Sequence, residues 1–258
     1  MKIMGILNTT PDSFSDGGSY ISEEAAFLKI KQMVADGADI IDIGGESTRP
    51  GSTPVTLEEE LKRTVDTIKK ISKDIAVPIS IDTYKAEVAL QAVAAGATII
   101  NDIGGAKFDP LMPEVMAKSG AIVVLMHNRR SGDKTYDDII EDIKKELLES
   151  LDLVLKAGVK KEKIILDPGF GFAKTAAQNV ELAGRIEELQ SLGYPLLVGI
   201  SKKRTIGHLL GGVDVDNRSI GTVATTCYFA SKGIDYVRVH DVLENKQAAS
   251  VMQQLQKS

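Results

Sequence analysis

The sequence has little of several residue types. It contains one cysteine, Cys227, and no tryptophan, and aromatic residues make up 5% of it. One cysteine excludes an internal disulfide framework, and scarce aromatics disfavour recognition of stacked bases. A formal net charge of −5 disfavours a nucleic-acid partner held through its phosphates. No stretch approaches the roughly 18 apolar residues that a membrane span needs. We therefore expect a soluble, cytoplasmic protein with no nucleic-acid and no membrane partner.

Several local sequence signatures are missing as well. The first residues, Met1 to Gly5, lack the charged, apolar and cleavage regions of a secretory signal. Neither His-Glu-x-x-His nor Cys-x-x-Cys occurs, so a zinc site is not expected. The glycine-rich run from Gly169 to Lys174 has neither the dinucleotide-binding spacing nor a Walker Lys-Ser/Thr pair. These absences exclude a zinc enzyme and the two common nucleotide-binding loops.

What the 258 residues do contain is a repeated pattern of apolar strand, polar loop and amphipathic helix. Eight such units follow one another. The predicted strands are 3–7, 39–43, 78–81, 98–100, 121–126, 163–166, 195–200 and 235–239. The predicted helices are 23–35, 57–72, 85–95, 111–118, 136–157, 178–192, 219–232 and 243–256.

Glycines mark the helix ends in this pattern. Six predicted helices stop at a glycine that is soon followed by the next strand, namely Gly37, Gly96, Gly120, Gly158, Gly193 and Gly233. Apolar strands separated by helices indicate a parallel sheet covered by helices. Eight units in this length favour an α/β fold of the (β/α)8 TIM-barrel type, with residues 1–258 as a single domain. An open, doubly wound sheet is the alternative.

Polar side chains fall at the carboxyl ends of the predicted strands, where barrel enzymes keep their sites. They are Asn8, Asp82, Asn101, His127, Asp167, Lys203 and His240. Strands commonly end in polar residues, so a single polar residue at a strand end does not by itself indicate a functional site. Carboxylates and amides inside apolar runs, as in Ile81-Asp82 and Ile100-Asn101-Asp102-Ile103, are harder to explain without a function, because a buried carboxylate needs a partner.

Two groups of side chains suggest ligands. Asp82, Asn101 and Asp167 would suit a flat heterocycle with several N–H groups, because a carboxylate accepts two parallel N–H bonds. They could instead hold a divalent metal, or simply bond one another. Lys203, Arg238 and His240 lie on the last strands, where many barrels bind phosphate, and would suit a phosphate or pyrophosphate. A basic side chain or an imidazole by itself is more often part of a surface ion pair.

The motifs in their order resemble the dihydropteroate synthase family. The most specific are the loops Asn8-Thr9-Thr10-Pro11-Asp12-Ser13-Phe14-Ser15-Asp16-Gly17-Gly18 and Gly44-Gly45-Glu46-Ser47-Thr48-Arg49-Pro50-Gly51. The shorter motifs follow in the family's order: Ile81-Asp82-Thr83, Ile100-Asn101-Asp102-Ile103, Leu125-Met126-His127, Leu166-Asp167-Pro168-Gly169-Phe170-Gly171-Phe172, Ser201-Lys202-Lys203 and Val237-Arg238-Val239-His240-Asp241. The resemblance covers essentially the whole chain.

The resemblance implies an activity in folate biosynthesis. Members of this family join p-aminobenzoate to 6-hydroxymethyl-7,8-dihydropterin pyrophosphate and release pyrophosphate. They are barrel enzymes that need Mg²⁺, are the target of sulfonamides, and usually form homodimers. The resemblance therefore implies a transferase with these two substrates, Mg²⁺ as cofactor, sulfonamides as inhibitors and a homodimeric state.

The same resemblance implies roles for individual residues. Asp82, Asp167, Lys203 and Arg49 would be catalytic. The pterin would be bound by Asp82, Asn101, Ile103, Met126, Asp167 and Lys203. The p-aminobenzoate pocket would be formed by Thr48, Pro50, Gly171, Phe172, Ser201 and Lys203. The pyrophosphate would be bound by Arg49, Arg238 and His240, and Mg²⁺ by Asn8. Thr48, Arg49 and Pro50 would belong to a flap that closes over the second substrate.

We expect an SN1-like displacement without a covalent enzyme intermediate, because the pterin methylene carries a good leaving group and the electron-rich ring can support positive charge there. The amine needs no strong base before it attacks, which fits the lack of an evident nucleophile–histidine pair. Some positions depart from the usual family pattern, namely Asn128, Arg129, Arg130, Ala173, Lys202 and Arg204. Two other interpretations share the pterin-binding barrel. A methyltetrahydrofolate–corrinoid methyltransferase would explain Asp82, Asn101 and Asp167 but not the pyrophosphate-binding set. A non-catalytic pterin-binding protein would not need to keep Arg49, Lys203 and Asn8.

Overall fold

A computed structural model describes residues 1–9, 23–47 and 53–257. Within these residues eight parallel strands form one sheet, in the order β6-β5-β4-β3-β2-β1-β8-β7. The strands are β1 (Lys2–Asn8), β2 (Ile40–Gly44), β3 (Ile79–Asp82), β4 (Ile99–Asp102), β5 (Ile122–Met126), β6 (Ile164–Asp167), β7 (Leu197–Val198) and β8 (Tyr236–Val239).

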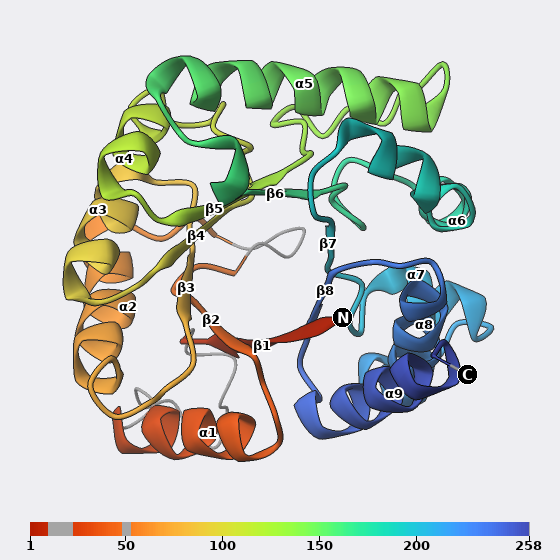
Figure 1. The fold of residues 1–258 in the computed structure, drawn as a ribbon, viewed down its shortest axis with the longest axis horizontal. Coiled ribbons are helices and arrows are strands. Elements are labelled where there is room, and N and C mark those ends of the chain that lie inside the picture. Colours follow the sequence, from red (N-terminus) through yellow and green to blue (C-terminus); the bar gives the residue numbers. More distant parts are fainter. Residues whose placement is uncertain (10–22, 48–52, 258) are drawn as a thin grey trace.

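The two ends of this sheet approach each other. A parallel bridge between Leu166 and Leu196 joins β6 to the segment that leads into β7. The sheet is therefore a nearly closed barrel, and Figure 1 shows the helices ringing it. This arrangement confirms the predicted (β/α)8 fold and rules out the open, doubly wound sheet.

Helices alternate with the strands along the chain. They are α1 (Glu23–Ala35), α2 (Leu57–Ile71), α3 (Ala86–Ala95), α4 (Met112–Ser119), α5 (Ile139–Ala157), α6 (Ala176–Gly184), α7 (Arg204–Leu209), α8 (Ser219–Ser231) and α9 (Val242–Leu255). Short 3-10 helices are η2 (Lys161–Lys163), η3 (Ile186–Leu192) and η4 (Val215–Arg218). None of the described helices is both long and apolar enough to span a membrane.

The barrel has two apolar layers because successive side chains of a strand point to opposite faces. One layer is a small cluster inside the barrel, contributed by Met4, Ile40, Ile99, Val124, Ile165 and Leu197. Their neighbours along the strands, such as Ile41, Ile100 and Val123, belong to the larger cluster that packs the strands against the helices. The inner layer forms a dry floor, and the side chains above it face the mouth of the barrel.

The helix ends largely agree with the sequence. All six glycines predicted to stop a helix have a positive φ, between 62° and 123°. Thr56, Asp138 and Thr175 cap the amino ends of α2, α5 and α6 through their side-chain oxygens. The Asp138 cap makes α5 begin at Ile139, three residues later than predicted.

Two helical segments differ from the prediction. The helix predicted over 178–192 is two elements, α6 and η3, separated at Arg185. Gly184 weakens the helix at this point, and the Arg185 guanidinium bonds Glu188 and Asp138 instead of pointing into solvent. The helix α7 was not predicted, because six residues are too few to show a helical period.

Candidate active site

The candidate site lies at the carboxyl ends of the strands, one step above the apolar floor. Moving two residues along a strand returns to the same face of the sheet. From Ile40 this step leads to Asp42, from Ile99 to Asn101, from Val124 to Met126 and from Ile165 to Asp167. The alternation that builds the floor therefore also places these four side chains in the mouth.

An arginine joins the carboxylates of neighbouring strands in the mouth. Arg238 Nε donates to Asp42 Oδ2 at 2.6 Å, and its Nη2 donates to Asp82 Oδ2 at 2.5 Å. Asn101 Nδ2 donates to the same Asp42 oxygen at 3.2 Å. Arg238, predicted to bind pyrophosphate, is thus already bonded to a residue predicted to bind the pterin.

Asp42 is the residue of this network that sequence reasoning missed. It is fully buried, and its Oδ1 has no hydrogen-bond partner among the described residues. The signal was present, because Asp42 interrupts the apolar run Ile40-Ile41-Asp42-Ile43. The same argument had identified Asp82 and Asn101, whereas Asp42 was counted as an ordinary strand residue.

The carboxylates of the site are hard to ionise in this setting. Burial raises the pKa of Asp82 to about 7, although the Arg238 guanidinium opposes the shift. Burial likewise raises the pKa of Asp167, against the lowering effect of Lys203 and of the Gly169 N–H group. A ligand that donates N–H bonds to these oxygens would favour their charged forms.

Lys203 lies between Asp167 and the loop that follows it. A Cβ atom on Gly199 would lie 3.9 Å from both Asp167 Oδ2 and Lys203 Nζ. The ammonium group donates to the Phe170 carbonyl at 2.5 Å and lies 4.6 Å from the centroid of the Phe172 ring. Burial lowers the pKa of Lys203 to about 8, and Asp167 partly offsets this. Lys203 is therefore placed to contact both predicted substrate subsites.

The loop from β6 to α6 carries Gly171 and Phe172, which were predicted to border p-aminobenzoate. Asp167 Oδ1 accepts a hydrogen bond from the Gly169 N–H at 2.7 Å. Gly169 has a φ of 70°, and a Cβ there would lie 2.0 Å from the His127 carbonyl oxygen. Only glycine fits this position, which explains one glycine of the Asp167–Phe172 motif.

Ser201 and His240 meet at the ends of β7 and β8. Ser201 Oγ lies 2.9 Å from His240 Nδ1, and it accepts the His240 backbone N–H at 3.1 Å. The structure thus brings a hydroxyl and a histidine together, although no nucleophile–histidine pair is evident in the sequence. The two residues are 39 positions apart, so only the closing of the barrel brings them together.

Three further predicted residues surround this centre. Ile103 and Met126 are buried, with 9% and 3% of their surface exposed. Asp102 fixes the turn around Ile103, because its two oxygens accept the N–H groups of Gly104 and Ala106, both at 2.7 Å. Asn8 ends β1 and is half-buried.

Asn8 fits the expected magnesium ion. A Cβ on Gly44 would lie 3.8 Å from Asn8 Oδ1 and 3.6 Å from Asp82 Oδ2, so the missing side chain leaves room beside two oxygens. The described residues contain no cluster of three or more His, Cys, Asp or Glu suited to a metal. Mg²⁺ commonly uses one or two protein oxygens together with waters and substrate phosphates, so one amide oxygen beside a carboxylate is a sufficient donor set.

Thr48, Arg49 and Pro50 lie outside the described residues. The segments flanking them are held by a half-buried lysine: Lys85 Nζ donates to Glu46 Oε2 at 2.7 Å, to Glu60 Oε2 at 2.5 Å and to the Val55 carbonyl at 2.7 Å. The positions of residues 46 and 55, on either side of this stretch, are thus fixed together.

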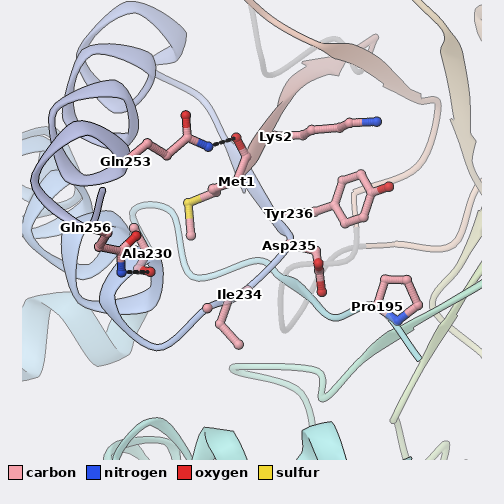
Figure 2. Close-up of a pocket in the computed structure, with 10 residues that line it drawn as sticks. Met1, Lys2, Pro195, Ala230, Ile234, Asp235, Tyr236, Gln253 and Gln256 are labelled. Atoms are coloured by element: carbon pink, nitrogen blue, oxygen red, sulfur yellow. Dashed lines mark hydrogen bonds between the residues drawn. The ribbon is translucent and has the colours of Figure 1, made fainter. Parts of the chain in front are cut away.

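A separate cavity of about 290 Å³ lies at the opposite, amino-terminal end of the barrel (Figure 2). Lys2 and Tyr236, the first residues of β1 and β8, line it. Its carboxylate, Asp235, accepts the Leu196 N–H at 2.9 Å. The cavity is lined by one cation, Lys2, one carboxylate, Asp235, and two amides, Gln253 and Gln256. We assign the site to the carboxyl ends, because only there, among the described residues, do carboxylates of two strands bond to one arginine and lie beside a lysine.

Known proteins resemble this chain over nearly its whole length. Residues 4–240 match the family described as pterin binding enzyme. Dihydropteroate synthase of Bacillus subtilis is 51% identical over 250 residues, covering 97% of this chain and 87% of the relative. A crystal structure of dihydropteroate synthase from Clostridium difficile, obtained in the presence of pteroic acid, is 48% identical with a TM-score of 0.95, covering 100% of this chain and 97% of that one. The Yersinia pestis enzyme in complex with a sulfonamide drug is 40% identical with a TM-score of 0.94, covering 100% and 94%.

Proposed function

The chain belongs to the pterin-binding enzymes, in the dihydropteroate synthase family, and from this premise we propose how its residues carry out the reaction. The enzyme transfers the dihydropterin-methyl group of 6-hydroxymethyl-7,8-dihydropterin pyrophosphate to p-aminobenzoate, giving 7,8-dihydropteroate in folate biosynthesis. The observation that carries the proposal is the cluster of Asp82, Asn101, Asp167, Lys203 and Arg238 at the carboxyl ends of the barrel strands.

The pterin would occupy the mouth above the apolar floor. Asp82 and Asp167 would accept N–H bonds from its amino-amidine edge, and Asn101 can both donate and accept. Lys203 would donate to a ring acceptor, and Ile103 and Met126 would border the ring faces. The raised pKa values of the two carboxyl groups support this assignment, since N–H donors of a ligand replace the water lost on burial.

The pyrophosphate would lie toward β1 and β8. Arg238 and His240 would bind it together with Arg49, whose position lies outside the described residues. Asp42 and Asp82 already form ion pairs with Arg238 in the absence of substrate. The guanidinium group is therefore held in position before the pyrophosphate binds. Asn8, with the pyrophosphate itself, would hold Mg²⁺, which when bound neutralises charge on the leaving group.

p-Aminobenzoate would lie beside the β6–α6 loop and the start of α7. Gly171, Phe172, Ser201 and Lys203 would form its pocket, with Thr48 and Pro50 added from the neighbouring loop. The Phe172 ring supplies an apolar wall, and the Lys203 ammonium above it supplies a positive charge for a carboxylate.

The displacement would be dissociative. The carbon–oxygen bond to pyrophosphate breaks first, the electron-rich pterin carries the positive charge, and Asp82 and Asp167 stabilise it. The amine of p-aminobenzoate then attacks the methylene carbon, and the new C–N nitrogen passes its proton to the released pyrophosphate or to solvent. Arg238 and His240 receive the departing pyrophosphate. No group of the enzyme becomes covalently attached.

The Ser201–His240 pair provides the sharpest test of that mechanism, because such a pair could in principle form a covalent intermediate. The Ser201 hydroxyl oxygen already accepts the His240 backbone N–H, which supports a positioning role instead. We expect Ser201→Ala to keep kcat within about tenfold of wild type, with KM for p-aminobenzoate raised. A pterin–enzyme adduct trapped during turnover, and absent from Ser201→Ala, would contradict the dissociative mechanism.

One assay separates this function from its rivals. The protein is mixed with the pterin pyrophosphate, p-aminobenzoate and Mg²⁺, and release of pyrophosphate is measured. Release that depends on p-aminobenzoate is the expected result. Pterin binding without release would indicate a binding protein, and methyl transfer from methyltetrahydrofolate to a corrinoid would indicate the methyltransferase.

Three further properties belong to the proposal. Sulfonamides would compete with p-aminobenzoate, as the complex of the Yersinia pestis relative suggests. A homodimer is supported by exposed apolar side chains on and around α7 and α8, including Leu209, Val215 and Ile220, the last with 84% of its surface exposed. Light scattering would measure the mass in solution. A cytoplasmic location fits the single cysteine, Cys227, which suits a reducing compartment.

A further inference from the structure

A buried lysine outside the predicted site contacts backbone carbonyl groups of the β6–α6 loop. Lys174 has 5% of its surface exposed. Its ammonium group donates to the carbonyl oxygens of Gly169 and Phe172, both at 3.1 Å, and lies 2.9 Å from His127 Nδ1. Lysine has three N–H donors, and these three acceptors use them all.

His127 is arranged to accept the third of these bonds. It has 1% of its surface exposed, and burial lowers its pKa to about 4, so the ring is neutral near pH 7. Its Nε2 makes no hydrogen bond of good geometry among the described residues, but it lies 3.2 Å from Glu146 Oε2, and this negative charge favours the proton on that nitrogen. The lone pair of Nδ1 is then directed at Lys174.

The loop is thus held by two lysines from different parts of the chain. Lys203 donates to the Phe170 carbonyl, and Lys174 donates to the carbonyls on either side of it, Gly169 and Phe172. Other bonds complete the arrangement: Asn179 Oδ1 accepts the Gly171 N–H at 2.8 Å, and the Tyr136 hydroxyl donates to the Ala173 carbonyl at 3.1 Å. These four side chains make five bonds, one to each residue from Gly169 to Ala173, which is the segment that carries Gly171 and Phe172.

Such a buried charge is a costly way to stabilise a fold. Among the described residues no carboxylate pairs directly with the Lys174 ammonium group, and burial lowers its pKa to about 7 although the charges of Asp167 and Glu146 oppose the shift. A buried charge without a close counter-ion costs stability, and an apolar residue would avoid that cost. The arrangement makes sense if the geometry of the loop matters more than the stability of the chain.

We propose that Lys174 is a positioning residue for the second substrate: by holding the carbonyls of Gly169 and Phe172, it fixes the loop that presents Phe172 to p-aminobenzoate. This inference rests on the proposed function. Lys174 touches neither substrate, and it acts through the backbone of the loop. The pterin anchors Asp82 and Asn101 lie on β3 and β4 and receive no bond from it, while the third anchor, Asp167, meets the loop through the Gly169 N–H group.

The test separates the two substrates. Lys174→Met keeps a chain of similar length and removes the three donors, while Lys156→Met on the exposed face of α5 serves as a matched control for loss of a lysine charge. KM for p-aminobenzoate and for the pterin pyrophosphate, together with kcat and Tm, are measured for both variants and the wild type. We expect Lys174→Met to raise KM for p-aminobenzoate about tenfold or more, and KM for the pterin pyrophosphate by less than about threefold.

Three outcomes overturn the proposal. Both KM values could rise equally, both could stay unchanged while Tm falls, or the control could reproduce the effect. If Lys174→Met does not fold, Lys174→Arg carries the test: it keeps the charge but replaces the compact ammonium with a larger, planar guanidinium whose N–H groups point in other directions. It should then show the same selective rise, and an unchanged KM for p-aminobenzoate would refute the role. Wild-type protein that makes no dihydropteroate would refute the proposed function instead of the role of Lys174.

Discussion

At the scale of single residues, the mouth of the barrel depends on one arginine between two carboxylates. Arg238 bonds both Asp42 and Asp82, but the two acids differ in their surroundings. Asp42 is fully buried and also accepts a bond from Asn101, whereas the Asp82 side chain has 11% of its surface exposed. This difference predicts opposite consequences when each charge is removed.

Asp82→Asn should stabilise the protein at neutral and higher pH. The folded pKa of Asp82, about 7, lies above its ordinary value of 3.8. The folded state therefore binds more protons between these values, and the wild type loses stability as the pH rises through this window. The difference in Tm between Asp82→Asn and wild type should be small near pH 4, grow toward pH 7 and then level off. A pH-independent difference would show that Asp82 is not destabilised by burial.

Asp42→Asn should act in the other direction. It removes the carboxylate that compensates a buried guanidinium and orients Asn101, and breaking one partner of a buried pair costs about 3–5 kcal/mol. Urea unfolding at pH 8 measures the free energy of unfolding, with Asp82→Asn as the matched comparison. An Asp42→Asn variant as stable as Asp82→Asn would mean that Arg238 can be held by either acid alone.

These residues also show the limits of sequence reasoning. Asp82, Asn101 and Asp167 could be predicted because a polar residue in an apolar run needs a reason. The bonds of Arg238 to two strands, and the approach of Ser201 to His240, could not be predicted, because they depend on distances across a closed barrel. Lys174 was recognised only as part of a glycine-rich run, since nothing in the sequence marks its side chain as buried.

At the scale of elements, the loops that follow β2 and β6 are fixed by different means. The β6–α6 loop is held through its own carbonyls and through a glycine that no other residue can replace. The stretch after β2 is held at its flanks by Lys85. The boundaries of most helices could be predicted, since glycines and capping residues mark them, whereas the break between α6 and η3 depends on tertiary bonds of Arg185.

Gly169→Ala should distort the β6–α6 loop. The new Cβ would meet the His127 carbonyl, whereas a Cβ on Gly132, which has a similar φ of 72°, would meet nothing within 4 Å. Gly132→Ala therefore isolates the cost of the left-handed backbone, about 1–2 kcal/mol. We expect Gly169→Ala to destabilise more than this control and to lose most of the turnover. Equal effects of the two substitutions on unfolding and turnover would disprove the close contact.

Lys85→Met should weaken the anchoring of residues 46 and 55. Glu60 has 1% of its surface exposed and would keep a buried carboxylate without its cation. The expected loss is about 3–5 kcal/mol in the free energy of unfolding. Lys118→Met, which removes an exposed pair on α4, should change stability little. A small loss for Lys85→Met would show that water replaces the lysine.

At the scale of the whole molecule, the barrel determines which residues can meet. The strand count and their parallel order could be predicted from eight repeated units and their apolar strands. The sequence did not show that β7 would be only Leu197–Val198, with the barrel completed by the bridge between Leu166 and Leu196. That closure places β8 beside β1 and the segment before β7 beside β6. Residues from the first and last strands of the chain therefore meet in one site.

The central claim is that the reaction takes place at the carboxyl ends of the strands and not in the cavity at the amino ends. The most direct measurement compares kcat/KM for dihydropteroate formation in Asp167→Asn and Asp235→Asn, two neutralised carboxylates at opposite ends of the barrel. We expect Asp167→Asn to lose about 100-fold or more in kcat/KM, because a charge-stabilising group of the site is removed, while Asp235→Asn stays close to wild type. If Asp235→Asn lost activity while Asp167→Asn retained it, the reaction would not take place at the carboxyl ends of the strands.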